Sequence, residues 1–185
     1  GMFDRETAYD SIDYSENDTD AHHEVARRAA EESIVLLKND GLLPLGKERI
    51  QSVAVIGPNA DSREILKGNY NGTASVSYTI LEGIQKELAG SVRVYYSEGC
   101  DLVRDQVEAL AEPDDRISEA VAAARRSDVV FLCLGLNATL EGEEGDAANS
   151  YAGADRKDLG LPDPQRRLLQ AVCETGTPVV LLVAC

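Results

Sequence analysis

Four runs of nearly uninterrupted apolar residues mark the chain. They span residues 52–57, 92–96, 128–135 and 178–185. A strand that is buried on both faces has this continuous apolar pattern, whereas a strand with one solvent face alternates apolar and polar residues. The pattern therefore predicts four strands of a mainly parallel sheet that is covered on both faces.

Segments with helical spacing of apolar residues separate these runs. Residues 80–88 predict a short helix that Gly90 ends, Asp114 or Asp115 begins a second helix, and residues 164–175 predict a third. Strands that alternate with helices form right-handed βαβ units. We therefore predict an α/β fold, a three-layer α/β/α sandwich with a mainly parallel, flavodoxin-like sheet.

The two ends of the chain differ from this pattern. Residues 1–20 are acidic and lack periodicity, which predicts an extended linker, and residues 21–185 form the α/β domain. A helix begins the domain, and we expect it to run from a cap near Asp20 past Leu37 to the turn at 39–41. The last strand pattern has no turn or polar tail after it, so we expect a fragment that is incomplete at its C-terminus.

The balance of charge excludes two classes of partner. The formal net charge is −15, from 33 acidic and 18 basic residues. Nucleic-acid binding needs a basic face, and an anionic membrane surface repels an acidic protein, so we expect neither. No apolar run approaches the roughly 18 residues needed to span a bilayer. A chain of this length can bury roughly 70% of its unfolded surface, so the core requires no disulfide or metal.

Cysteines and histidines show no metal-site pattern. The cysteines lack CxxC spacing, so we expect buried free thiols, which favours a reducing, cytoplasmic compartment. The Gly1-Met2 start leaves secretion as the alternative. His22 and His23 are adjacent, so on a helix they point about 100° apart and are expected to be solvated. We predict no metal and no cofactor. The cysteines are Cys100, Cys133, Cys173 and Cys185.

A long segment after the third predicted strand concentrates acidic side chains. Residues 136–162 are rich in small and polar residues, and Glu141, Glu143, Glu144 and Asp146 fall within six positions. A loop of this length in a compact domain is usually functional or disordered. We interpret one of these carboxylates as a catalytic acid, and a solvated acidic loop is the alternative.

Two other kinds of site fit the sequence less well. The first predicted strand leads into Gly57-Pro-Asn-Ala60, which lacks the further glycines of a dinucleotide-binding G-x-G-x-x-G turn. The acidic segment lacks the alternating spacing of an EF-hand calcium loop. Ligands of parallel sheets bind beyond the carboxyl ends of strands, so the loops after the first and third strands both belong to the candidate site.

A series of motifs covers nearly the whole chain. They are residues 1–4 (GMFD), 30–45 (AEESIVLLKNDGLLPL), 53–60 (VAVIGPNA), 68–70 (GNY), 140–143 (LEGE) and 155–162 (DRKDLGLP). In this order they resemble the second domain of glycoside hydrolase family 3, the β-glucosidase and β-xylosidase family. In that family a (β/α)8 barrel supplies a nucleophilic Asp, and the following α/β sandwich domain supplies the acid/base Glu.

The resemblance implies part of a retaining, exo-acting β-glycosidase that hydrolyses terminal β-linked glucose or xylose. The substrate would be an oligosaccharide or an aryl β-glycoside, and the barrel of the same chain would be the domain's partner. One alternative is a non-catalytic carbohydrate-binding or structural domain of the same ancestry. Another is an unrelated flavodoxin-like module.

The family motif, an apolar residue followed by E-x-E, matches residues 140–143 and implies that Glu143 is the acid/base. Glu144, which follows directly, is the alternative. Asp155 and Arg156 match the family's D-R pair, but they lie well beyond the motif, past an insertion of small residues. The resemblance implies that both bind substrate, and pairing with a loop carboxylate is the alternative for Arg156.

Three further residues are implied as substrate-binding candidates. Glu141 matches the first acid of the E-x-E motif. Asn69 and Tyr70 belong to the Gly-Asn-Tyr motif, which leans towards the β-xylosidase branch of the family. A turn that fixes the loop is the alternative for this motif.

Overall fold

The computed structural model describes residues 2–68, 70–103, 112, 114–138, 140 and 158–184. The chain separates into two compact units, residues 1–40 and residues 41–185. In the first unit a 3₁₀ turn at Tyr14–Glu16 precedes helix α1, which spans Asp20–Ser33.

Helix α1 is capped at its first turn and ends earlier than predicted. The Thr19 hydroxyl accepts a hydrogen bond from the His22 N–H, and the His22 ring accepts one from the Thr19 N–H. The helix ends at Ser33, and Ile34 is already extended, with φ −72° and ψ 125°. The prediction of a helix past Leu37 is therefore wrong. The β-branched residues after Ser33 have low helix propensity, and no residue of α1 is buried to offset it.

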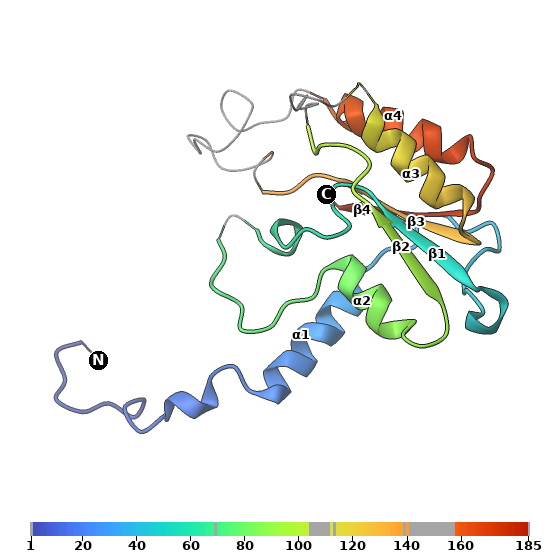
Figure 1. The fold of residues 1–185 in the computed structure, drawn as a ribbon. Helices are drawn as coiled ribbons and strands as arrows, with labels where there is room; N and C mark the ends of the chain where they lie inside the picture. The colour runs from blue at the N-terminus through green and yellow to red at the C-terminus, as the bar shows by residue number, and fades with distance from the viewer. Residues whose placement is uncertain are drawn as a thin grey trace. The chain divides into compact units, whose positions relative to one another are not determined.

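The second unit is built on a parallel sheet, as the apolar runs predict (Figure 1). Its strands are β1 (Ser52–Ile56), β2 (Arg93–Ser97), β3 (Val129–Gly135) and β4 (Val179–Ala184). They lie in the order β2-β1-β3-β4, and each neighbouring pair is parallel. This is the order of the first four strands of a flavodoxin-like sheet, so the predicted fold class is confirmed.

The central strands of this sheet are buried, and its edge strands are only partly so. Every β1 residue from Val53 to Ile56 is fully buried, and β3 is nearly as well covered. By contrast, Tyr96 of β2 and Leu181 and Val183 of β4 are exposed. Continuous apolar runs thus predicted all four strands, but only at β1 and β3 did the pattern mean burial on both faces.

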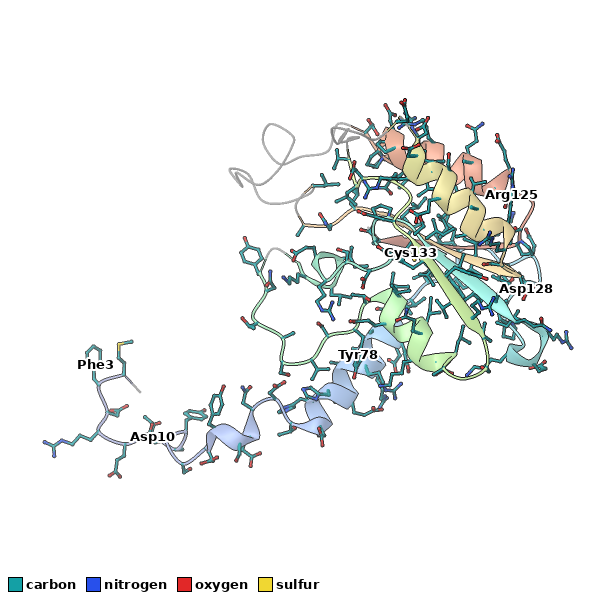
Figure 2. All side chains as sticks on the ribbon, in the orientation of Figure 1. Phe3, Asp10, Tyr78, Arg125, Asp128 and Cys133 are labelled. Carbon is teal, nitrogen blue, oxygen red and sulfur yellow. The ribbon has the colours of Figure 1, made fainter. Side chains whose placement is uncertain are left out.

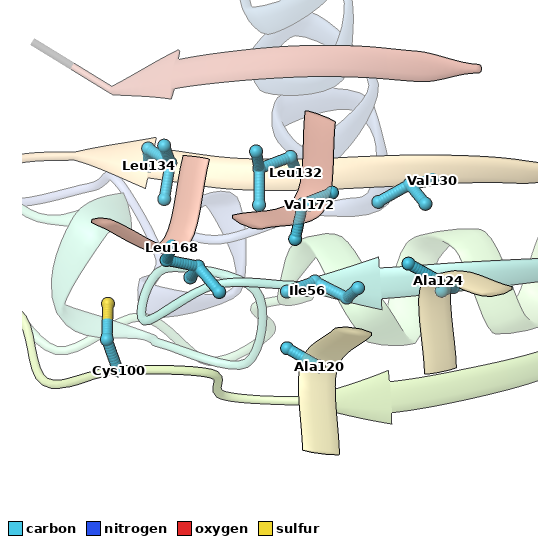
Figure 3. Packing of buried hydrophobic residues seen from close by; sticks show 10 residues of the cluster. Ile56, Cys100, Ala120, Ala124, Val130, Leu132, Leu134, Leu168 and Val172 are labelled. Atoms are coloured by element: carbon cyan, nitrogen blue, oxygen red, sulfur yellow. The ribbon is translucent and has the colours of Figure 1, made fainter. Parts of the chain in front are cut away.

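Helices cover both faces of the sheet (Figure 1). They are α2 (Ile80–Glu87), α3 (Asp115–Arg125) and α4 (Asp163–Cys173). Ala120 and Ala124 of α3, with Leu168 and Val172 of α4, pack on one face against side chains of β1 and β3 (Figure 3). Leu81 of α2 packs on the other face. No helix among the described residues is long and apolar enough to cross a membrane.

At the amino ends of the strands, Asp128 fastens β3 to β1. Its carboxylate accepts hydrogen bonds from the N–H groups of Gln51 (2.7 Å) and Ser52 (2.9 Å). These two bonds lower the pKa of the Asp128 carboxyl, because they favour its charged form. The start of the central strand pair is therefore held by a charge-assisted contact.

The described cysteines are free thiols, but they differ in exposure. Cys100 and Cys133 are buried, as expected, and Cys133 lies on β3 within the sheet (Figure 2). Cys173 is exposed, so the prediction that it is buried is wrong. It follows the buried Val172 on α4, and adjacent helical residues point about 100° apart. Cys185 lies outside the described residues.

Burial raises the pKa of the Cys133 thiol to about 12. We therefore expect iodoacetamide at pH 8 to alkylate Cys173 in the folded protein and to modify Cys133 roughly 10³-fold more slowly, because the thiolate is the reactive form. Peptide mass spectrometry measures each cysteine separately, with urea-unfolded protein as the control. Equal alkylation rates in the folded protein would contradict the burial of Cys133.

Candidate functional site

The carboxyl ends of the strands meet at one edge of the sheet. From β1 the strand order runs to β2 on one side and to β3 on the other, so the order reverses between β1 and β3. Ligands of open α/β sheets bind in the crevice at such a reversal. The loops that begin at Gly57 and Leu136 leave from these two strands, so the two predicted loops start side by side.

The loop after β1 lies close against β3. Gly57 has φ +123° and donates its N–H to the Ser97 carbonyl at 3.1 Å. A Cβ on Gly57 would lie 2.1 Å from the carbonyl oxygen of Cys133. Two residues on, the Asn59 side chain is buried, and within the described residues neither its Oδ1 nor its Nδ2 has a hydrogen-bond partner. A buried amide with open donors and acceptors is rare in folded proteins, and no pattern in the sequence predicts this one.

Hydrogen bonds connect this loop to the start of α2. The Thr79 hydroxyl donates to Asp61 Oδ1 at 2.8 Å, and it accepts from the Glu82 N–H at 3.2 Å. Glu82 accepts in return from the Thr79 N–H at 2.9 Å and from Arg63 at 2.6 Å. The Thr79 N–H and then Arg63 lower the pKa of the Glu82 carboxyl. Asp61 and Arg63 of the segment after β1 are therefore bonded to the two residues of the capping box that begins α2.

The loop after β2 is held by an ion-pair cluster. Arg116 of α3 donates to Asp101 Oδ1 at 2.6 Å and pairs with Glu98.

Burial, and then the charges of Glu98 and Asp61, raise the pKa of the Tyr96 phenol. This edge of the sheet thus offers a neutral hydroxyl, which can donate to or accept from a polar ligand.

The end of β3 is held by an amide side chain. Gln165, in the first turn of α4, hydrogen-bonds both the N–H and the C=O of Gly135. Beyond it Leu136 and Leu140 are buried, and the Leu140 N–H closes a turn on the Asn137 carbonyl at 3.0 Å. The chain is therefore anchored to the core up to the residue before the E-x-E motif.

Most of the predicted site residues lie outside the described residues. These are Asn69, Glu141, Glu143, Glu144, Asp146, Asp155 and Arg156. Tyr70 is described, and the residue is 87% exposed. Asn71 Nδ2 donates to the Gly68 carbonyl at 2.9 Å, which joins the residue before Asn69 to the residue after Tyr70. Among the described residues, no group of three or more His, Cys, Asp or Glu side chains is placed to hold a metal ion.

The protein is thus an α/β/α domain in which two loops begin side by side where the strand order reverses. A family model described as "Glycosyl hydrolase family 3 C-terminal domain" matches residues 34–185. The chain belongs to this family.

Named relatives extend well beyond this chain. A β-xylosidase of Formosa agariphila is 35% identical over 190 residues, which covers 99% of this chain and 24% of the relative. A periplasmic β-glucosidase of Salmonella typhimurium is 33% identical over 178 residues, which covers 88% of this chain and 22% of the relative. The chain therefore spans about a quarter of the length of these proteins.

Solved structures show the same fold. A β-glucosidase from Erythrobacter marinus has a TM-score of 0.75 and 35% identity, with 90% of this chain and 24% of that chain covered. A family 3 exo-β-xylosidase, solved with a xylobiose aziridine probe, has a TM-score of 0.70 and 34% identity, with 87% and 18% covered. The matches include both xylosidases and glucosidases, so they do not distinguish xylose from glucose as the sugar.

We expect Gly57→Ala to destabilise the protein, because Ala disfavours the positive φ and its Cβ would clash with the Cys133 carbonyl. The backbone conformation alone costs about 1–3 kcal/mol. Urea unfolding monitored by circular dichroism measures the change. The control is Gly83→Ala within α2, where a Cβ has open space, and it should stabilise by about 0.5–1 kcal/mol. Equal stability of the two variants would contradict the close approach at Gly57.

Proposed function

We propose that this domain is part of a retaining, exo-acting β-glycosidase and that Glu143 is its general acid/base. One observation carries the proposal. Leu140, the residue before the E-x-E motif, is buried just beyond the end of β3, the strand that borders the reversal of strand order. Glu143 lies only three positions further along the sequence than this anchored residue. The β-xylosidase and β-glucosidase relatives support a substrate that ends in β-linked xylose or glucose.

The acidic sequence around Glu143 suits a general acid. A retaining glycosidase needs one protonated carboxyl to donate to the leaving oxygen and one ionised carboxyl, about 5–5.5 Å away, to attack the anomeric carbon. A carboxyl stays protonated near neutral pH only when burial or like charges raise its pKa. Glu141, Glu144 and Asp146 bring such charges close in the sequence. After the glycosyl-enzyme forms, the same Glu143 removes a proton from the attacking water.

The nucleophile in this proposal is an Asp of a (β/α)8 barrel in the same polypeptide. Family membership supports this partner, and the chain's share of its relatives, about a quarter, leaves room for it. The substrate is an oligosaccharide or aryl β-glycoside bound between the barrel and this edge of the sheet. The residues proposed to contact it are Asn69, Tyr70, Glu141, Asp155 and Arg156.

In the full-length enzyme we expect Glu143→Gln to lower kcat/KM by about 10²–10⁴-fold on glycosides with poor leaving groups, because they depart only when protonated. Loss on 2,4-dinitrophenyl glycosides should be far smaller, and azide should restore turnover by replacing the water that needs a base. Steady-state kinetics on both substrate classes measures the difference.

Glu144→Gln is the matched control and should keep nearly full activity on both classes. If Glu144→Gln shows the leaving-group dependence and Glu143→Gln does not, the acid/base is Glu144. If neither does, the domain is not the source of the acid, and a carbohydrate-binding or structural role replaces the proposal.

We further expect residues 1–185 alone to hydrolyse no β-glycoside, because the proposed site needs a nucleophile from the barrel. Release of 4-nitrophenol from its β-glucoside and β-xyloside measures this, with the full-length enzyme as the positive control. Turnover by the isolated residues 1–185 would show that the domain carries a complete site.

A further inference from the structure

The side chain of Gln165 is fully buried and hydrogen-bonds three backbone groups. Its Oε1 accepts from the Gly135 N–H at 2.8 Å. Its Nε2 donates to the Gly135 carbonyl at 2.8 Å and to the Leu102 carbonyl at 2.7 Å. Both amide hydrogens and the amide oxygen therefore have a partner, as expected of a buried glutamine.

This contact takes the place of a neighbouring strand at the end of β3. β1 ends at Ile56, in register with Leu132, so β3 continues past it to Gly135. On the other side of β3, β4 stays paired with it, and the Ala184 carbonyl accepts from the Leu136 N–H at 2.9 Å. Without Gln165, the N–H and C=O of Gly135 would be buried and unpaired on the side of β3 where β1 has already ended. Burying unpaired backbone groups carries a desolvation cost.

The same contact joins the bases of two loops. Gly135 is the last residue before the segment that leads to Glu143, and Gln165 follows that segment, 30 positions later. Leu102 belongs to the loop after β2. The first turn of α4 is itself fixed, since Pro164 is buried and its ring sets φ for the helix. We call residues 136–164 the acid-bearing segment, because Glu143 lies within it. One side chain therefore connects both ends of this segment to the loop after β2.

We propose that Gln165 is a positioning residue for the acid/base. It fixes the backbone from which the chain leads to Glu143, and it touches neither the substrate nor the reacting atoms. This inference rests on the proposed function, that Glu143 is the general acid. A general acid must lie within hydrogen-bond reach of the leaving oxygen, and a displacement of about 1 Å can cost about 10²-fold in rate.

The test is Gln165→Glu in the full-length enzyme, since glutamate has the size of glutamine. An ionised carboxylate repels the two carbonyls to which Gln165 donates, whereas a protonated carboxyl can donate to one of them. At pH 7 we expect kcat/KM to fall about 10–10²-fold on glycosides with poor leaving groups and much less on 2,4-dinitrophenyl glycosides, because kcat/KM reports the step in which the acid protonates the leaving group. On the substrates with poor leaving groups KM should stay within about twofold of the wild-type value, because substrate contacts are unchanged.

The pH profile is the second readout. The ratio of variant to wild-type kcat/KM on poor substrates should rise as the pH is lowered, because protonation of the new carboxyl restores one donor. Gln170→Glu is the matched control: it makes the same change on the same helix, at an exposed position, and should keep a ratio near one throughout.

Equal losses on both substrate classes, or a ratio that does not change with pH, would overturn the positioning role. If Glu143→Gln lacks the leaving-group dependence, the proposed function fails. If Glu143→Gln shows it and Gln165→Glu does not, only this inference fails. Should circular dichroism show that Gln165→Glu does not fold, Gln165→Asn takes the same leaving-group test. It keeps the amide but shortens its reach by one methylene, and the same two outcomes decide.

Discussion

The close approach of backbone on both sides of β3 is the constraint on which the edge of the sheet depends. A Cβ on Gly57 would lie 2.1 Å from the Cys133 carbonyl oxygen, and a Cβ on Gly135 would lie 2.0 Å from that of Ala184. Both glycines have positive φ, which other residues rarely adopt. The loops after β1 and β3 therefore start from backbone whose separation leaves no room for a side chain.

Local sequence patterns predicted most of the fold. Continuous apolar runs located all four strands, although only β1 and β3 have the burial on both faces that this composition indicates. The patterns failed where tertiary contacts decide. The helix that was expected to pass Leu37 ends at Ser33, because spacing alone does not show whether an apolar stripe gains a partner. Cys173 was expected to be buried, but its direction depends on which face of α4 meets the sheet.

The sequence identified the acidic candidates through a motif, but it did not identify the groups that support the edge. One feature of the sequence does point to Gln165. It lies on the apolar face of α4 with Leu168 and Val172, where a polar residue is unusual and needs buried hydrogen-bond partners. Its partners could not be read in the same way, because Gly135 and Leu102 are distant in sequence and bond through backbone atoms that any residue has. The burial of Asn59 is equally invisible in the sequence, because it depends on how closely the loop after β1 lies against β3.

The Gln165 contact also bears on how the acid-bearing segment can change in length. The two hydrogen bonds between Gly135 and Gln165 close the stretch of chain between them, so residues added to that stretch lengthen a loop whose ends stay joined. Each doubling of a closed segment costs only about 0.6 kcal/mol. Residues inserted between the E-x-E motif and the Asp155-Arg156 pair are therefore tolerated at little thermodynamic cost. A change in the number of residues between Gly135 and Gln165 can therefore alter what surrounds the acid while the sheet beneath it keeps its register.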